Sequence, residues 1–146
     1  MCIRVLIADD QSRARHSLTA LLTAMRWSTP DRAGQPTFAG LLPVEVIGEA
    51  EDGLQAVEQV RTLHPDVVVL DLQLRAVSAP EPQLDGMATI RMIKSGWPAI
   101  RIVVLTMFAT DRASVLAAGA DAFLLKGCPT NELLEAVRPD GRTRLG

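Results

Sequence analysis

The sequence has few cysteines and histidines, which restricts the kinds of site it can form. Two cysteines and two histidines occur among 146 residues, and none has the spacing of a zinc site. Cys2 precedes the first predicted strand and Cys128 follows the last, so we expect them at opposite ends of a parallel sheet, too far apart for a disulfide. We interpret both as free thiols in a reducing compartment.

Long apolar runs and an excess of one charge are also missing. The apolar runs are short, far below the roughly 20 residues that cross a bilayer. The 15 basic and 17 acidic residues give a net charge of -2, which does not favour a nucleic-acid or membrane surface. The first residues enter a strand pattern without the basic leader and apolar core of a secretion signal. We therefore expect a cytoplasmic protein with no membrane segment.

What the sequence does contain is an alternation of strand and helix patterns. Continuous Val/Ile/Leu-rich runs predict strands at 3–8, 44–48, 66–70, 101–105 and 121–125. Helical apolar spacing predicts helices at about 12–25, 54–63, 86–95, 111–118 and 130–138. The strict alternation predicts a doubly wound five-stranded parallel sheet of order 2-1-3-4-5 inside a three-layer α/β sandwich.

Local signals predict where some helices begin and end, and where loops lie. Ser12 and Thr130 are expected N-caps, and Gly119 and Pro139 are expected helix ends. Two segments, at about 27–43 and 74–84, contain prolines and predict irregular insertions. We expect the first at the end of the sheet away from Asp71 and the second at the end that carries Asp71, as part of a 72–85 loop.

Polar residues follow four of the predicted strands at the point where each strand ends. Asp9 and Asp10 follow the first, Asp71 the third, Thr106 the fourth and Lys126 the fifth. Because the carboxyl ends of parallel strands form one rim where ligands bind, these side chains should converge. Three carboxylates, a hydroxyl and an ammonium suit a divalent metal and a phosphoryl group held on a carboxylate.

Each rim residue has an ordinary alternative when it is taken alone. An Asp-Asp pair before a helix is often a cap and dipole partner, a lysine after a strand is usually a solvated charge, and a threonine there commonly just ends the strand. Their combination on four strands favours the phosphoryl site. Asp71 ends the central strand and is the candidate nucleophile, which would form an aspartyl-phosphate.

These residues and their surroundings resemble a bacterial two-component response-regulator receiver domain. The phrases Gly48-Glu49-Ala50 and Ala118-Gly119-Ala120-Asp121 resemble the subfamily that usually carries LuxR-type helix-turn-helix outputs. The resemblance implies a flavodoxin-like fold. The matching segments cover nearly the whole chain, at 5–10, 46–50, 66–72, 85–86, 103–106, 118–127 and 132–138.

The resemblance also implies a role for each rim residue. It implies Asp71 as the phosphoacceptor, and it implies Thr106 and Lys126 as contacts of the phosphoryl group. The implied cofactor is Mg²⁺. Its implied ligands are Asp9, Asp10, Asp71 and the backbone carbonyl of Gln73.

The implied switch consists of Thr106 and Phe123, in which the aromatic ring turns inward as Thr106 moves toward the phosphoryl group. An ordinary core phenylalanine is the alternative for Phe123. The implied partner is a sensor histidine kinase, and a receiver homodimer is a further option. No recognition helix is predicted, so these residues do not support DNA binding by this chain alone.

The chain departs from the family pattern after Asp71. Leu74-Arg75 replaces the usual Met-Pro, and extra residues precede Asp85-Gly86. We hypothesise that this insertion screens the site and alters the lifetime of the phosphoryl group. Residues 1–138 are expected to form one receiver domain, followed by a short tail at 139–146 without an output domain.

We therefore interpret the chain as a phosphoacceptor in a phosphorelay, with Mg²⁺-dependent phosphorylation of Asp71 and a link to transcription through a DNA-binding domain that these residues lack. This is a signalling module and not an enzyme with an external substrate. One alternative is a degenerate receiver that acts as a phosphorylation-independent interaction module. Another is an aspartyl-nucleophile phosphatase, which is disfavoured because Gln73 stands where such enzymes carry a second aspartate. A nucleotide or flavin binder is disfavoured by the absence of glycine-rich phosphate-binding motifs.

Overall fold

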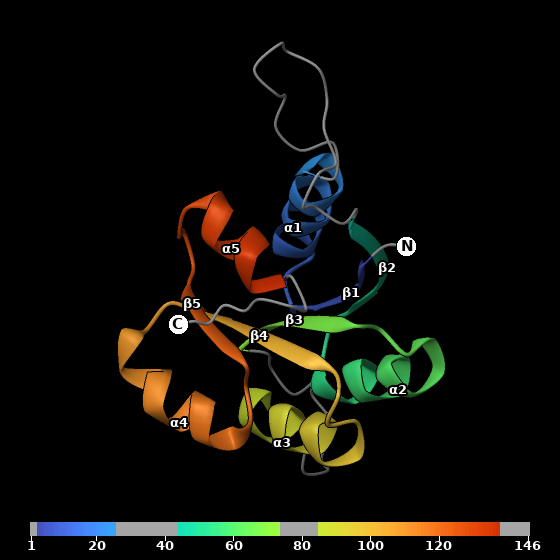
Figure 1. Cartoon of the computed structure of the whole chain (residues 1–146), viewed down its shortest axis with the longest axis vertical. Helices are drawn as coiled ribbons and strands as arrows, with labels where there is room; N and C mark the ends of the chain where they lie inside the picture. Colours follow the sequence, from blue (N-terminus) through green and yellow to red (C-terminus); the bar gives the residue numbers. More distant parts are fainter. Residues whose placement is uncertain (1–2, 26–43, 74–84, 138–146) are drawn as a thin grey trace.

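The computed structural model describes residues 3–25, 44–73 and 85–137, which form a central sheet covered by helices on both faces (Figure 1). The strands are β1 (Ile3–Ala8), β2 (Val44–Ala50), β3 (Val67–Asp71), β4 (Arg101–Thr106) and β5 (Ala122–Leu125). All neighbouring strands pair in parallel, in the order β2-β1-β3-β4-β5. The predicted fold class and strand order are confirmed.

The helices lie in two layers. They are α1 (Ser12–Met25), α2 (Gly53–Leu63), α3 (Gly86–Gly96), α4 (Arg112–Ala118) and α5 (Thr130–Val137), with a 3-10 turn η1 (Ala109–Asp111) before α4. In Figure 1, α1 and α5 cover one face of the sheet, and α2, α3 and α4 cover the other. The described helices do not include any with both the length and the hydrophobicity of a membrane span.

Alternate residues of each strand point to different cores. In β3, Val67 and Val69 belong to the cluster with α1 and α5, whereas Val68 and Leu70 belong to the cluster with α2, α3 and α4. Because both faces are covered, a central strand such as β3 is buried at every position. Its first polar side chain, Asp71, therefore comes where the strand reaches the rim.

Several predicted boundaries differ from the structure. Ser12 and Thr130 are the first helical residues, so the predicted starts at 12 and 130 are confirmed, but the two residues are not the N-caps that the sequence predicted. In α1 the reason is visible in the backbone, because the Arg15 N–H already donates to the Gln11 carbonyl at 3.0 Å. The predicted helix at 111–118 is α-helical only from Arg112, because η1 precedes it.

Two helices have aspartate caps that the sequence analysis did not single out. Asp52 accepts from the Gln55 N–H at 2.8 Å at the start of α2, and Asp85 accepts from the Ala88 N–H at 2.8 Å at the start of α3. Both satisfy a backbone donor that a helix start leaves free. The end at Gly119 is confirmed, and its φ of 120° is a conformation that favours glycine.

The structure does not describe the two predicted insertions or the predicted helix end at Pro139. Residues 27–43, residues 74–84 and Pro139 are outside the described residues. The described residues before and after 74–84 approach each other closely at Leu72 and Gly86. A Cβ atom on Gly86 would overlap the Leu72 carbonyl, so α3 begins directly against the residue that follows Asp71.

Candidate phosphoacceptor and metal site

Sheet hydrogen bonds position the candidate residues at the rim. The Asp9 N–H donates to the Ala50 carbonyl at 3.0 Å, which extends the β1–β2 ladder by one residue. On the other side, the Lys126 N–H donates to the Thr106 carbonyl at 2.8 Å, beyond the end of β5. The functional side chains therefore start from backbone positions that the parallel ladders fix.

Three carboxylates meet at this rim. Carboxylate oxygens of Asp9, Asp10 and Asp71 all lie within 4.8 Å of one another. Asp9 and Asp71 are only 1% and 3% exposed. One oxygen of each is held by its own loop, because Asp9 Oδ1 accepts from the Gln11 N–H at 2.9 Å and Asp71 Oδ1 accepts from the Gln73 N–H at 3.0 Å.

Lys126 supplies the ammonium that the sequence predicted. Its Nζ lies 3.0 Å from Asp71 Oδ2 and 4.0 Å from Asp9 Oδ2. Burial raises the pKa of Asp9, and the charges of Asp71 and Asp10 raise it further, against the lowering effects of the Gln11 N–H and Lys126. One ammonium thus leaves the carboxylate cluster with excess negative charge.

This donor set fits a hard divalent cation. Mg²⁺ prefers oxygen ligands and is commonly held by one or two carboxylates together with water. The cluster provides carboxylate oxygens from three residues within the distance of a shared ligand shell. The Gln73 backbone N–H donates to Asp71 Oδ1. The ligand role of the Gln73 carbonyl stays a prediction.

Thr106 is buried at the end of β4, and its hydroxyl contacts other groups than Asp71. It accepts from the Phe108 N–H at 3.2 Å and lies 3.3 Å from the Gln73 amide nitrogen. It donates to Asp111 Oδ2 at 3.1 Å. Asp111 and the Gln73 side chain were not predicted as neighbours of Thr106. The one available signal was an aspartate five positions after the threonine.

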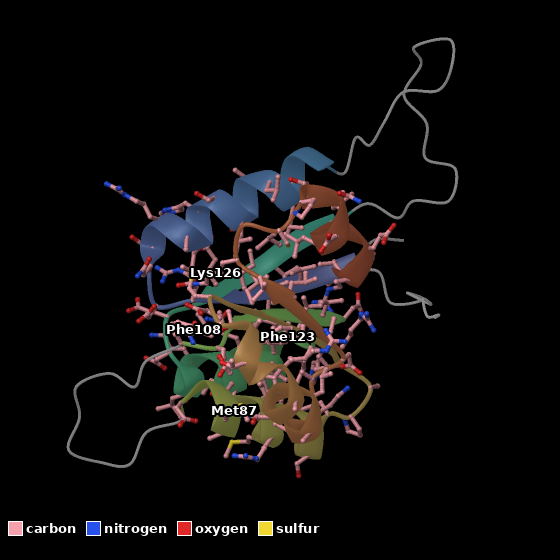
Figure 2. All side chains as sticks on the ribbon, turned by 90° about the vertical axis from the view of Figure 1, so that its left-hand side faces the viewer. Met87, Phe108, Phe123 and Lys126 are labelled. Carbon is pink, nitrogen blue, oxygen red and sulfur yellow. The ribbon has the colours of Figure 1, made fainter. Side chains whose placement is uncertain are left out.

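Phe123 lies in β5 between the core and a pocket. Its ring packs against the core under α2, α3 and α4, and the Arg112 guanidinium carbon lies 5.9 Å from the ring centroid. The ring also lines a pocket of about 520 Å³ with residues such as Lys126 and Glu132. Figure 2 shows Phe123 beside β5, with Lys126 and Phe108 toward the rim. Its switch role stays a prediction.

Comparison with known proteins identifies the family. The chain matches the response regulator receiver domain over residues 38–138. The response regulator protein VraR of Staphylococcus aureus is 27% identical over 144 residues, covering 97% of this chain and 58% of VraR. The chain thus spans little more than half the length of this relative.

Solved response-regulator structures also superpose on this chain. The receiver domain of the response regulator NarL from Mycobacterium tuberculosis superposes with a TM-score of 0.73 at 25% identity, covering 98% of both chains. A LuxR-family two-component response regulator from Aurantimonas superposes with a TM-score of 0.70 at 26% identity, covering 94% of this chain and 83% of that one. The predicted resemblance to LuxR-type response regulators is confirmed. The chain belongs to the response regulator receiver domains of two-component systems.

Proposed function

We propose that this chain is a phosphoacceptor: Asp71 takes a phosphoryl group from a sensor histidine kinase, and the aspartyl-phosphate shifts the conformation of the domain. The observation that carries the proposal is the position of the Asp71 carboxylate, which is 3% exposed, lies 3.0 Å from Lys126 and belongs to the three-carboxylate cluster. A carboxylate so placed can act as a nucleophile with the charges it needs close by.

The two oxygens of Asp71 have different roles in this proposal. Oδ1 is engaged by the Gln73 N–H, whereas Oδ2 faces Lys126. Oδ2 is therefore the oxygen that would form the new bond to phosphorus while the bond from phosphorus to the kinase histidine breaks. Lys126 would then pair with a phosphoryl oxygen, because its ammonium already lies at the attacking oxygen.

The neighbouring carboxylates, Asp9 and Asp10, would hold the cofactor. Mg²⁺ bound there would neutralise charge on the carboxylates and on the transferred group, which is the main requirement of phosphoryl transfer. Burial and then the charges of Asp71 and Asp10 raise the pKa of Asp9, and a cation bound at the cluster would oppose this effect.

We propose a signalling role and not an enzyme with an external substrate. An aspartyl phosphatase needs a general acid near its nucleophile, and Gln73, two residues after Asp71, cannot supply a proton. The Gln73 amide instead contacts the Thr106 hydroxyl. The chain covers 58% of VraR, so we place any control of transcription in a DNA-binding part outside these residues. A cytoplasmic location and a receiver homodimer remain predictions.

Intact-protein mass after incubation with acetyl phosphate and Mg²⁺ tests the proposal. We expect one phosphoryl adduct on the wild-type chain, none on Asp71→Asn, and none on the wild type when EDTA removes the metal. Asp66→Asn is the matched control, because Asp66 lies just before β3, at the opposite end from Asp71, and binds the Arg4 N–H at 2.9 Å.

Asp66→Asn should still carry the phosphoryl adduct. If the wild type carries no adduct, the proposed function is wrong and a degenerate receiver is favoured. An adduct that persists on Asp71→Asn would place the acceptor elsewhere.

A further inference from the structure

The Thr106 hydroxyl has a single proton, and its contacts show where that proton goes. Thr106 Oγ lies 3.1 Å from Asp111 Oδ2. A carboxylate can only accept, so Thr106 is the donor in this bond. The same oxygen accepts from the Phe108 N–H at 3.2 Å and from the Gln73 amide at 3.3 Å. One donated and two accepted bonds use the full capacity of a hydroxyl.

The bond to Asp111 is also the stronger of the two available to that proton. The alternative acceptor is the Gln73 amide oxygen, which lies farther away at 3.4 Å. A bond to a carboxylate is charge-assisted and stronger than one to a neutral amide. The buried Thr106 is therefore held by Asp111 in the state described here.

Asp111 makes this bond from the end of η1, where its backbone is helical and its side chain does not cap α4. It immediately precedes α4, where aspartates normally accept from helix N–H groups. Asp52 and Asp85 do so at the starts of α2 and α3. Asp111 makes no such cap bond. Of the three aspartates at these helix starts, it alone directs its carboxylate to another element.

We propose that Asp111 is a positioning residue that holds Thr106 in a resting arrangement and competes with the phosphoryl group for its proton. The inference rests on the proposed function, because it requires a phosphoryl group on Asp71. A hydroxyl that donates to Asp111 has no proton left for a phosphoryl oxygen. Only molecules in which Thr106 has released Asp111 can make that contact, and this fraction lowers the apparent affinity for the phosphoryl group.

Titration with beryllofluoride, a noncovalent phosphoryl analogue, in the presence of Mg²⁺ tests the competition in the full chain. Asp111→Ala should bind beryllofluoride about ten- to hundredfold more tightly than the wild type, the effect of losing one charge-assisted hydrogen bond to the resting state. Asp111→Asn should be intermediate, because its amide oxygen accepts a weaker, neutral bond. Thermal unfolding confirms that each variant is folded, and Asp111→Asn keeps the test decisive should Asp111→Ala unfold.

Removing a negative charge near the site could tighten anion binding without involving Thr106. The effect of Asp111→Ala must therefore be compared with and without the Thr106 hydroxyl. Thr106→Val keeps the shape of the side chain and removes the proton. If Asp111 acts through Thr106, then Asp111→Ala has no effect on beryllofluoride affinity in the Thr106→Val background. An equal gain in both backgrounds would overturn the inference in favour of simple charge repulsion.

The amide resonance of Phe108 gives a second measurement that does not depend on affinity. This N–H donates to Thr106 Oγ, so its chemical shift follows the position of the hydroxyl. In Asp111→Ala without ligand, the resonance should move toward its position in the beryllofluoride-bound wild type.

The possible failures can be told apart. Wild-type binding with an unchanged Asp111→Ala overturns the inference alone. A wild type that binds no beryllofluoride overturns the proposed function, and the inference with it.

Discussion

Among single residues, the two buried carboxylates at the rim are compensated unequally. Lys126 lies 3.0 Å from Asp71 but 4.0 Å from Asp9. Asp71 thus has a close cation, whereas Asp9 depends on the Gln11 N–H and a distant ammonium. The raised pKa of Asp9 follows from its burial and from the nearby charges of Asp71 and Asp10. A bound cation should therefore stabilise the charged form of Asp9 more than that of Asp71, the proposed nucleophile.

Cys128 gives a pH prediction at the same scale. Burial raises the pKa of its thiol, and the charge of Glu132 raises it further. A raised pKa means less thiolate at a given pH, so alkylation should be slower than for an exposed cysteine and its pH profile should lie at higher pH. Mass spectrometry of iodoacetamide labelling, in a Cys2→Ser background, measures this profile.

Glu132→Gln should shift the Cys128 profile back toward lower pH, because it removes the second cause of the raised pKa. Glu135→Gln is the matched control on the same helix and should leave the profile in place. Equal profiles for the wild type and Glu132→Gln would contradict the assignment of Glu132 as a cause.

Individual rim residues could be predicted from the sequence, but their resting partners could not. Asp71 and Thr106 each follow an apolar run, and parallel topology brings strand ends together whatever the loops do. The bond from Thr106 to Asp111 depends instead on the backbone of η1, which no periodicity signals. The sequence predicted Asp111 as the first residue of the helix at 111–118, and the structure places it at the end of η1, before α4.

At the scale of elements, α3 is placed by its contact with the end of β3. Gly86, the first residue of α3, leaves no room for a Cβ against the Leu72 carbonyl. Gly86→Ala should therefore lower the free energy of unfolding by about 1–3 kcal/mol, as overpacking does. It should also lower the yield of the phosphoryl adduct, because Leu72 follows Asp71 directly. Urea unfolding and intact mass measure the two effects.

Gly96 offers a matched control at the other end of α3. A Cβ there would meet open space, so Gly96→Ala should leave stability unchanged or raise it by up to about 1 kcal/mol. Equal losses in the two variants would contradict the assignment of the cost at Gly86 to its contact with the Leu72 carbonyl.

For the whole molecule, the excess charge at the rim should be measurable as stability. A raised carboxyl pKa means that the charged form costs folding free energy above the folded-state pKa, and that this cost fades as pH falls through it. At neutral pH in EDTA, Asp9→Asn should therefore raise the melting temperature by a few degrees, the shift that about 1 kcal/mol produces in a domain of this size.

Mg²⁺ should raise the melting temperature of the wild type, because a ligand that binds only the folded state stabilises it. Asp9→Asn should lose most of this gain, because it lacks one of the clustered carboxylates. Thermal unfolding with and without Mg²⁺ gives both values. A wild type that Mg²⁺ does not stabilise, or equal gains in the two proteins, would contradict the metal site.

The overall architecture was the most predictable level of the structure. Continuous apolar strands such as Val67–Asp71 require helices on both faces, and the strand–helix alternation then leaves few topologies. The predicted starts at Ser12 and Thr130 were right, but their role as N-caps was wrong, since both are the first helical residues. Their positions depend on single backbone hydrogen bonds such as the one from Arg15 to Gln11.

The place of β5 at the edge of the sheet has a consequence for the lifetime of the assembled site. This strand has four residues, none of them fully buried, and among the described strands it pairs only with β4. Edge strands open more readily than central ones. An opening of β5 would carry Lys126 away while β1 and β3 keep the carboxylates together. We therefore expect amide hydrogen exchange at Lys126 to be faster than at Val69, and the duration of the ammonium–carboxylate contact to be set by that local opening and not by global unfolding.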